Sequence, residues 1–122
     1  MTKLFAIAVP ILKGKTEQWK KFNEDLNGKY KKQFNDSRAN LGVQERTFFQ
    51  STPMGDLALV TLQGENPEAA FQQFGQGEDE FTKWFKSQVK DIHGLDLTQK
   101  PPSSLMAQLL VESKPLEEQL FY

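Results

Sequence analysis

The chain of 122 residues contains no cysteine and a single histidine. The missing cysteine excludes disulfide bonds, thiolate metal ligands and cysteine nucleophiles. One histidine is a poor start for a zinc site, which needs several nitrogen or sulfur ligands. We therefore expect no metal centre and no cofactor, and the absence of cysteine fits a protein of the reducing cytoplasm.

Long hydrophobic runs and an excess of charge are also missing. The apolar run at residues 4–12 contains Pro10 and no small-residue cleavage site, so it reads neither as a signal peptide nor as the roughly 20 apolar residues of a membrane helix. Fifteen basic and sixteen acidic residues give a net charge of −1, whereas a phosphate-binding domain usually shows a basic excess. We expect neither a membrane nor a nucleic-acid partner.

The chain is rich in aromatic residues, with ten Phe, two Trp and two Tyr, although its apolar fraction is a modest 38%. Each buries a large area, so they can build a core. No repeat, low-complexity stretch or linker interrupts the chain. We predict one domain over residues 1–122, in which 113–122 form an irregular tail or an arm on a neighbour.

The first third of the chain predicts a strand followed by a helix. Residues 3–11 are apolar at both alternating sets of positions, which is typical of a central strand covered on both faces, and Pro10 marks its end. Thr16 is a good N-cap for a helix that reaches about Asn40, with Gly42 as its stop. Its apolar stripe recurs at steps of three and four at Trp19, Phe22, Leu26, Tyr30 and Phe34.

The middle of the chain predicts a hairpin and two more helices. Strands at 43–51 and 56–63 are separated by the Thr52-Pro53-Met54-Gly55 turn. A helix then begins at Asn66-Pro67, and a longer one covers 78–92 before Gly94.

The segment 105–112 can be read as a strand or as a helix capped by Ser104; we favour the strand, because the pattern lacks a fourth one. The order is then β-α-β-β-α-β, an α+β ferredoxin-like sandwich with helices on one face of a sheet. Because the first and third strands are apolar on both faces, a monomer would expose an apolar sheet. We expect two copies to pair face to face as a dimeric α+β barrel.

Four stretches carry a resemblance to a known family: Leu41-Gly42-Val43, residues 50–57, residues 81–86 and residues 92–97. The chain resembles, over about residues 15–112, a family of small bacterial proteins without an assigned function, in the dimeric α+β barrel superfamily with the antibiotic-biosynthesis-monooxygenase-like proteins. The haem-degrading branch has a Trp and a His spaced much as Trp84 and His93 are, and an Asn on its first strand that this chain lacks.

The candidate site residues are few. His93 could serve as a general base, although a helix-end residue is the plainer interpretation. Arg46 lies on a strand where alternate side chains face the barrel interior; it shares a face with Phe48, and a solvated edge charge is the alternative. Trp84, Trp19 and Tyr30 could line an aromatic pocket or belong to the core.

These residues leave three functions open. The first is a homodimer that binds a small apolar or aromatic ligand. The second is a cofactor-independent, monooxygenase-like enzyme for a flat organic substrate, using Trp84, His93 and Arg46. The third is a structural or regulatory protein that contacts a partner through its Lys-rich first helix or its tail.

Overall fold

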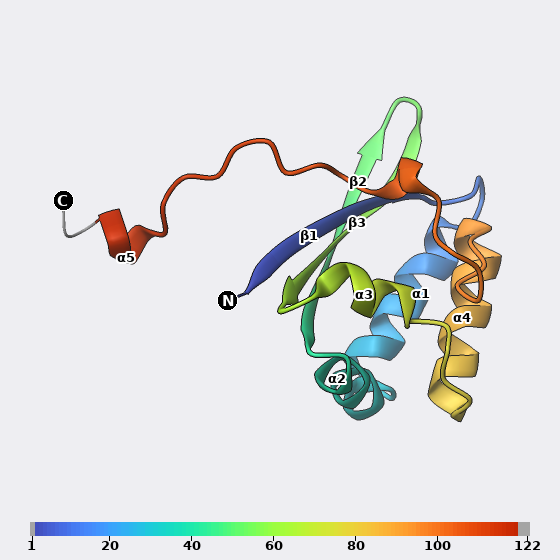
Figure 1. The fold of residues 1–122 in the computed structure, drawn as a ribbon. Helices are drawn as coiled ribbons and strands as arrows, with labels where there is room; N and C mark the ends of the chain where they lie inside the picture. Colours follow the sequence, from blue (N-terminus) through green and yellow to red (C-terminus); the bar gives the residue numbers. More distant parts are fainter. Residues whose placement is uncertain (1, 120–122) are drawn as a thin grey trace.

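The computed structural model describes residues 2–119 and forms a three-stranded antiparallel sheet with its main helices on one side (Figure 1). The strand order is β1-β3-β2. No helix among residues 2–119 is long and apolar enough to span a bilayer. The elements are β1 (Lys3–Pro10), α1 (Thr16–Asn27), α2 (Lys31–Asn40), β2 (Val43–Thr52), β3 (Gly55–Gly64), α3 (Pro67–Gln72), α4 (Glu80–His93), the 3₁₀ turn η1 (Ser103–Leu105) and α5 (Leu116–Gln119).

The register of the sheet decides which side chains face the helices. Val60 on β3 lies opposite Ile7 on β1 and Thr47 on β2, so these three share the helix-facing side. The predicted hairpin of β2 and β3 is confirmed, with β2 at an edge. The prediction that the first strand is central was wrong: β3 is central, because both neighbours pair with it.

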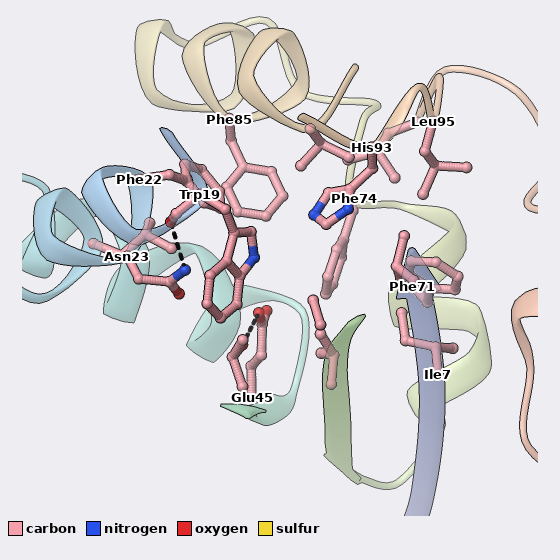
Figure 2. Close-up of a pocket in the computed structure, with 17 residues that line it drawn as sticks. Ile7, Trp19, Phe22, Asn23, Glu45, Phe71, Phe74, Phe85, His93 and Leu95 are labelled. Carbon is pink, nitrogen blue, oxygen red and sulfur yellow. Dashed lines mark hydrogen bonds between the residues drawn. The ribbon is translucent and has the colours of Figure 1, made fainter. Parts of the chain in front are cut away.

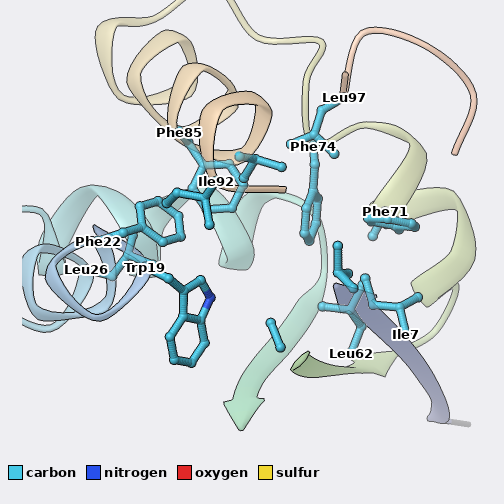
Figure 3. Close-up of a cluster of buried hydrophobic side chains, with 14 of the residues drawn as sticks. Ile7, Trp19, Phe22, Leu26, Leu62, Phe71, Phe74, Phe85, Ile92 and Leu97 are labelled. Atoms are coloured by element: carbon cyan, nitrogen blue, oxygen red, sulfur yellow. The ribbon is translucent and has the colours of Figure 1, made fainter. Parts of the chain in front are cut away.

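The core lies between the helix-facing side of the sheet and the helices (Figure 3). Phe5, Ile7 and Val9 of β1 are buried, as alternation predicts. Leu62 of β3 and Ile92 of α4 are completely covered. From the helices come Trp19, Phe22 and Leu26 of α1 and Phe81, Phe85 and Val89 of α4.

One helix was predicted over residues 16–40, and the structure has two. The amide groups of Gly28 and Tyr30 both donate to the carbonyl of Asp25, which closes α1 before α2 begins. Thr16 is the first helical residue rather than the cap, and its hydroxyl donates to Asp56. The break lies at Gly28, because glycine has more backbone freedom than any other residue and is unfavourable inside a helix.

Other predicted boundaries are confirmed. The Asn66 side chain accepts from the Ala69 amide and caps α3, with Pro67 at the first helical position. Gly94 ends α4 in the left-handed conformation, which glycine adopts without a Cβ penalty. α2 ends at Asn40, and Gly42 follows with a φ of 73°.

The strand favoured at 105–112 is not formed. Met106 makes a single antiparallel bridge with Ile7, the Ala107 amide donates to Ala6, and the chain then departs from β1 in an extended path (Figure 1). In this antiparallel register residues 107–110 would lie opposite residues 6–3 of β1, but no bridge beyond Met106–Ile7 forms there. Within 113–122, α5 is a one-turn helix, and residues 120–122 lie outside the described chain.

Candidate functional site

A cavity of about 50 Å³ lies between the helix-facing side of the sheet and the helices (Figure 2). All three strands contribute to it, together with α1, α3, α4 and the loop that follows α4. Most of its wall is aromatic or aliphatic: Ile7, Val9, Trp19, Phe22, Leu26, Ala58, Val60, Phe71, Phe74, Phe85, Val89, Leu95 and Leu97. Apolar walls with a few polar groups are typical of small-molecule sites.

Four polar side chains reach the same cavity: Asn23 of α1, Glu45 and Thr47 of β2, and His93 at the end of α4. Asn23 is held by a 2.8 Å hydrogen bond from its Nδ2 to the Trp19 carbonyl. Its amide also carries an acceptor oxygen. The site therefore combines aromatic walls with an amide, a carboxylate, a hydroxyl and an imidazole.

The Glu45 carboxylate is fixed by a buried ion pair. Arg38 Nε donates to Glu45 Oε1 at 2.7 Å, and both side chains are only 6% exposed. The Thr47 hydroxyl donates to Glu45 Oε2 at 3.3 Å. A buried carboxylate needs such partners to stay charged, so the cavity contains an oriented hydrogen-bond acceptor.

Arg38 reaches Glu45 through a cage of aromatic rings. Its guanidinium carbon lies 3.9 Å from the centre of the Phe74 ring, 4.6 Å from Phe85 and 5.0 Å from Phe34. Nη1 donates to the Ser37 hydroxyl at 2.9 Å, while the buried Nη2 has no hydrogen-bond partner in the described chain. The rings hold the guanidinium in place by stacking and cation–π attraction.

His93 presents an uncharged imidazole at neutral pH. Burial lowers its pKa below the ordinary 6.5, and the backbone hydrogen bond to Pro10 opposes this only in part. Nδ1 lies 2.8 Å from the Pro10 carbonyl, an acceptor only, so the proton is on Nδ1 and the lone pair on Nε2. A side chain that lines the cavity thus carries a basic nitrogen.

Trp19 forms the wall of the cavity next to β2. It is 6% exposed, and its ring centre lies 5.4 Å from that of Phe49, which is 42% exposed. The Lys20 ammonium lies 5.4 Å from the Phe49 ring on the outside. A buried ring of the cavity wall thus packs on a ring that is in contact with solvent, which makes this pair a candidate place for an opening.

Six residues were predicted for a site, and two of them, His93 and Trp19, line the cavity. Trp84 and Tyr30 pack on each other with ring centres 4.2 Å apart, behind Phe22, whose ring lies 5.3 Å from that of Trp84. Neither Trp84 nor Tyr30 lines the cavity.

Arg46 and Phe48 lie on the opposite side of the sheet. Arg46 donates to Gln63 Oε1 at 3.1 Å and to Gln44 Oε1 at 2.9 Å, and Phe48 is 53% exposed. By the register, both face away from the helices. The sheet therefore separates Arg46 from His93, and one chain does not bring them into a common site.

Sequence reasoning missed Arg38 and Asn23. Glu45 and Thr47 share a face with Val43 and Phe49, but the strand pattern alone does not say which face meets the helices. A charged residue alternating with apolar ones was the available signal for Glu45. Arg38 sits among polar residues of α2 and gave no signal, because its partner is supplied by β2.

No group of three or more His, Asp or Glu side chains that could hold a metal ion occurs within residues 2–119.

Comparison with known proteins gives a fold. No family model matches the chain, and no curated protein matches its sequence. Its structure is similar to the crystal structure of L-rhamnose mutarotase from Formosa agariphila, with a TM-score of 0.57 and 15% sequence identity, covering 92% of this chain and 99% of that one. The likeness is one of fold: helices and a small antiparallel sheet are arranged in this chain as they are in that protein.

Proposed function

We propose that this chain is a homodimeric small-ligand-binding protein whose ligand occupies the cavity between the sheet and the helices. The observation that carries the proposal is the aromatic cavity into which the oriented Glu45 carboxylate and the neutral His93 imidazole both reach. Such a concave, mostly apolar site with few polar groups is the usual form of a small-molecule site.

The walls define the class of ligand. The Trp19, Phe22, Phe74 and Phe85 rings favour a flat, largely apolar molecule. Glu45 accepts hydrogen bonds, so the ligand carries a hydroxyl or amine that donates to it. A small aromatic or alicyclic alcohol combines both properties.

The cavity is smaller than such a ligand. A volume of about 50 Å³ has room for a few water molecules, whereas pockets for drug-sized molecules measure about 300–1,000 Å³. Binding therefore requires a side chain to move. Trp19 is the candidate, because it lines the cavity and packs on Phe49, which is 42% exposed.

The open side of the sheet supports self-association. It carries Leu4, 50% exposed, and Phe48, 53% exposed. By the register, Leu57 and Leu59 lie on the same side as Ala6 and Ala8. An apolar sheet face of this kind usually marks an interface, and pairing with a second copy would cover it.

The test uses Trp19 as its own reporter. In the Trp84→Phe variant the only indole left is Trp19, and phenol is a flat ring with a donor hydroxyl. We expect a saturable change in Trp19 emission on titration with phenol, and a weaker affinity in the Trp84→Phe/Glu45→Gln variant. The matched control is Trp19→Phe, in which Trp84 reports from outside the cavity. An unresponsive Trp19, or an equal response of Trp84, would contradict the proposal.

A second candidate is an enzyme that transfers protons in the same cavity. It is favoured by His93, whose uncharged ring has the form that a general base needs. The structural neighbour is a sugar mutarotase, so L-rhamnose is a reasonable first substrate. Saturation-transfer NMR would show faster exchange between its anomers with the protein than with His93→Gln; equal rates would reject this candidate for that sugar.

A further inference from the structure

One nitrogen of the Arg38 guanidinium is buried without a hydrogen-bond partner. Arg38 is 5% exposed, and no acceptor within residues 2–119 reaches its Nη2. The other two nitrogens are used, since Nε donates to Glu45 Oε1 at 2.7 Å and Nη1 donates to the Ser37 hydroxyl at 2.9 Å. A buried donor without an acceptor carries the cost of its lost hydration. A bound ligand that supplies an acceptor would remove this cost.

The direction of the unused donor follows from the geometry of arginine. Nε and Nη2 present parallel N–H bonds on one side of the planar guanidinium, and arginine uses this fork to hold both oxygens of a carboxylate. Glu45 occupies only the Nε half of the fork, because its Oε2 accepts from the Thr47 hydroxyl at 3.3 Å and not from Nη2. Nη2 therefore points to the space beside the Glu45 carboxylate.

That space adjoins the cavity. Glu45, Phe74 and Phe85 line the cavity, and all three contact Arg38, the two rings with centres 3.9 Å and 4.6 Å from its guanidinium carbon. The rings carry no oxygen or nitrogen that could accept a hydrogen bond from Nη2. In Figure 2 the Glu45 side chain extends from β2 into the cavity. A molecule bound next to Glu45 can therefore bring the acceptor that Nη2 lacks.

We propose that the site recognises a vicinal diol, which is a pair of hydroxyl groups on adjacent carbon atoms. One hydroxyl donates to the Glu45 carboxylate, and the oxygen of the other accepts from Arg38 Nη2. Two neighbouring ligand oxygens thus meet two neighbouring protein groups, as the two oxygens of a carboxylate meet the fork of an arginine. This inference rests on the proposed ligand function and adds to it the second oxygen and its position.

Charge restricts the ligand further. Arg38 and Glu45 form an ion pair, so together they offer no net charge to an ionised ligand. A ligand carboxylate at Nη2 would also lie beside the Glu45 carboxylate, and two neighbouring buried anions disfavour each other. The aromatic wall favours a ring. The ligand class is therefore a neutral vicinal diol on a ring, and catechol is the simplest aromatic example.

Two isomeric probes test the position of the second oxygen. Catechol has its hydroxyl groups on adjacent carbons, whereas hydroquinone has the same atoms with the hydroxyl groups at opposite ends of the ring. Affinities are read from the saturable shift of the Ala58 methyl signal, because Ala58 lines the cavity, and an inert atmosphere prevents oxidation of the probes. One added hydrogen bond from a charged donor predicts that catechol binds about tenfold more tightly than hydroquinone.

Two matched variants identify the donor. Arg38→Lys keeps a positive charge near Glu45 but replaces the fork with a single ammonium group, so the preference for catechol should disappear. The control is Arg46→Lys, the same substitution on the opposite side of the sheet, where Arg46 bonds to Gln44 and Gln63. This variant should retain the preference of the unmodified protein.

The outcomes separate this inference from the ligand function on which it rests. Equal affinities of the unmodified protein for catechol and hydroquinone would overturn the vicinal-diol assignment and leave the ligand function in place, whether or not Arg38→Lys folds. A catechol preference that persists in folded Arg38→Lys would overturn the assignment of Nη2 as the donor. A protein that shows no saturable shift with catechol, hydroquinone or phenol would overturn the ligand function and this inference together.

Discussion

The buried Arg38–Glu45 pair gives the sharpest test of the site. In Arg38→Met the Glu45 carboxylate, 6% exposed, loses its 2.7 Å partner and remains in an apolar cavity with the Thr47 hydroxyl. Removing one member of a buried ion pair costs about 3–5 kcal/mol of unfolding free energy. We expect a loss in this range.

Replacing both members should cost far less. Methionine in place of Arg38 can still pack on the Phe34, Phe74 and Phe85 rings, and sulfur–aromatic contacts are favourable. Glu45→Leu then removes the uncompensated charge. Because Nη2 of Arg38 is already buried without a partner, the wild-type pair is not fully satisfied. The double variant Arg38→Met/Glu45→Leu should be closer to wild type than either single variant.

Urea unfolding followed by tryptophan fluorescence, at one fixed protein concentration, yields the four free energies of the double-mutant cycle. The control is Lys32→Met on α2, which removes the exposed ion pair with Asp36 and should leave the midpoint unchanged. A loss below about 1 kcal/mol in Arg38→Met, or a double variant as unstable as the sum of the two, would refute the reasoning.

Three further predictions concern single residues. Since burial holds the pKa of His93 below 6.5, the unfolded chain takes up this proton first, and stability should fall as the pH drops below about 6.5; this slope should vanish in His93→Gln, and a persisting slope would contradict the assignment. In Gly64→Ala the new Cβ would collide with the Gly42 carbonyl, so thermal unfolding should show a loss of about 1–3 kcal/mol, and an unchanged melting temperature would refute the close approach. Asn66→Ala removes the side-chain cap of α3 and should cost about 1 kcal/mol in urea unfolding, which a loss of stability near zero would disprove.

Local chemistry explains which elements the sequence could predict. Alternation in β1, the turn between β2 and β3, the cap at Asn66 and the stop at Gly94 depend on neighbouring residues, and all appear where expected. The break at Gly28 was missed because the helical stripe continues through it as far as Phe34. Strand position within a sheet depends on pairing partners, so β1 was wrongly expected at the centre.

Less of the candidate site than of the fold could be predicted from the sequence. His93 and Trp19 were identified as candidates from residue type, and the structure places both on the cavity. The Arg38–Glu45 pair depends on α2 packing against β2, which no local pattern encodes. The segment 105–112 has a strand-like composition but makes only one bridge within its own chain.

Under the proposed function, a small aromatic ligand enters between the sheet and the helices. Methyl NMR with phenol as the probe tests it directly, because neighbouring residues of β3 face opposite sides. Ala58 and Val60 line the cavity, whereas Leu57 and Leu59 face away from the helices. We expect saturable shifts of the Ala58 and Val60 methyl signals with little change at Leu57 and Leu59. Shifts confined to Leu57 and Leu59, or no saturable shift at any of the four, would contradict it.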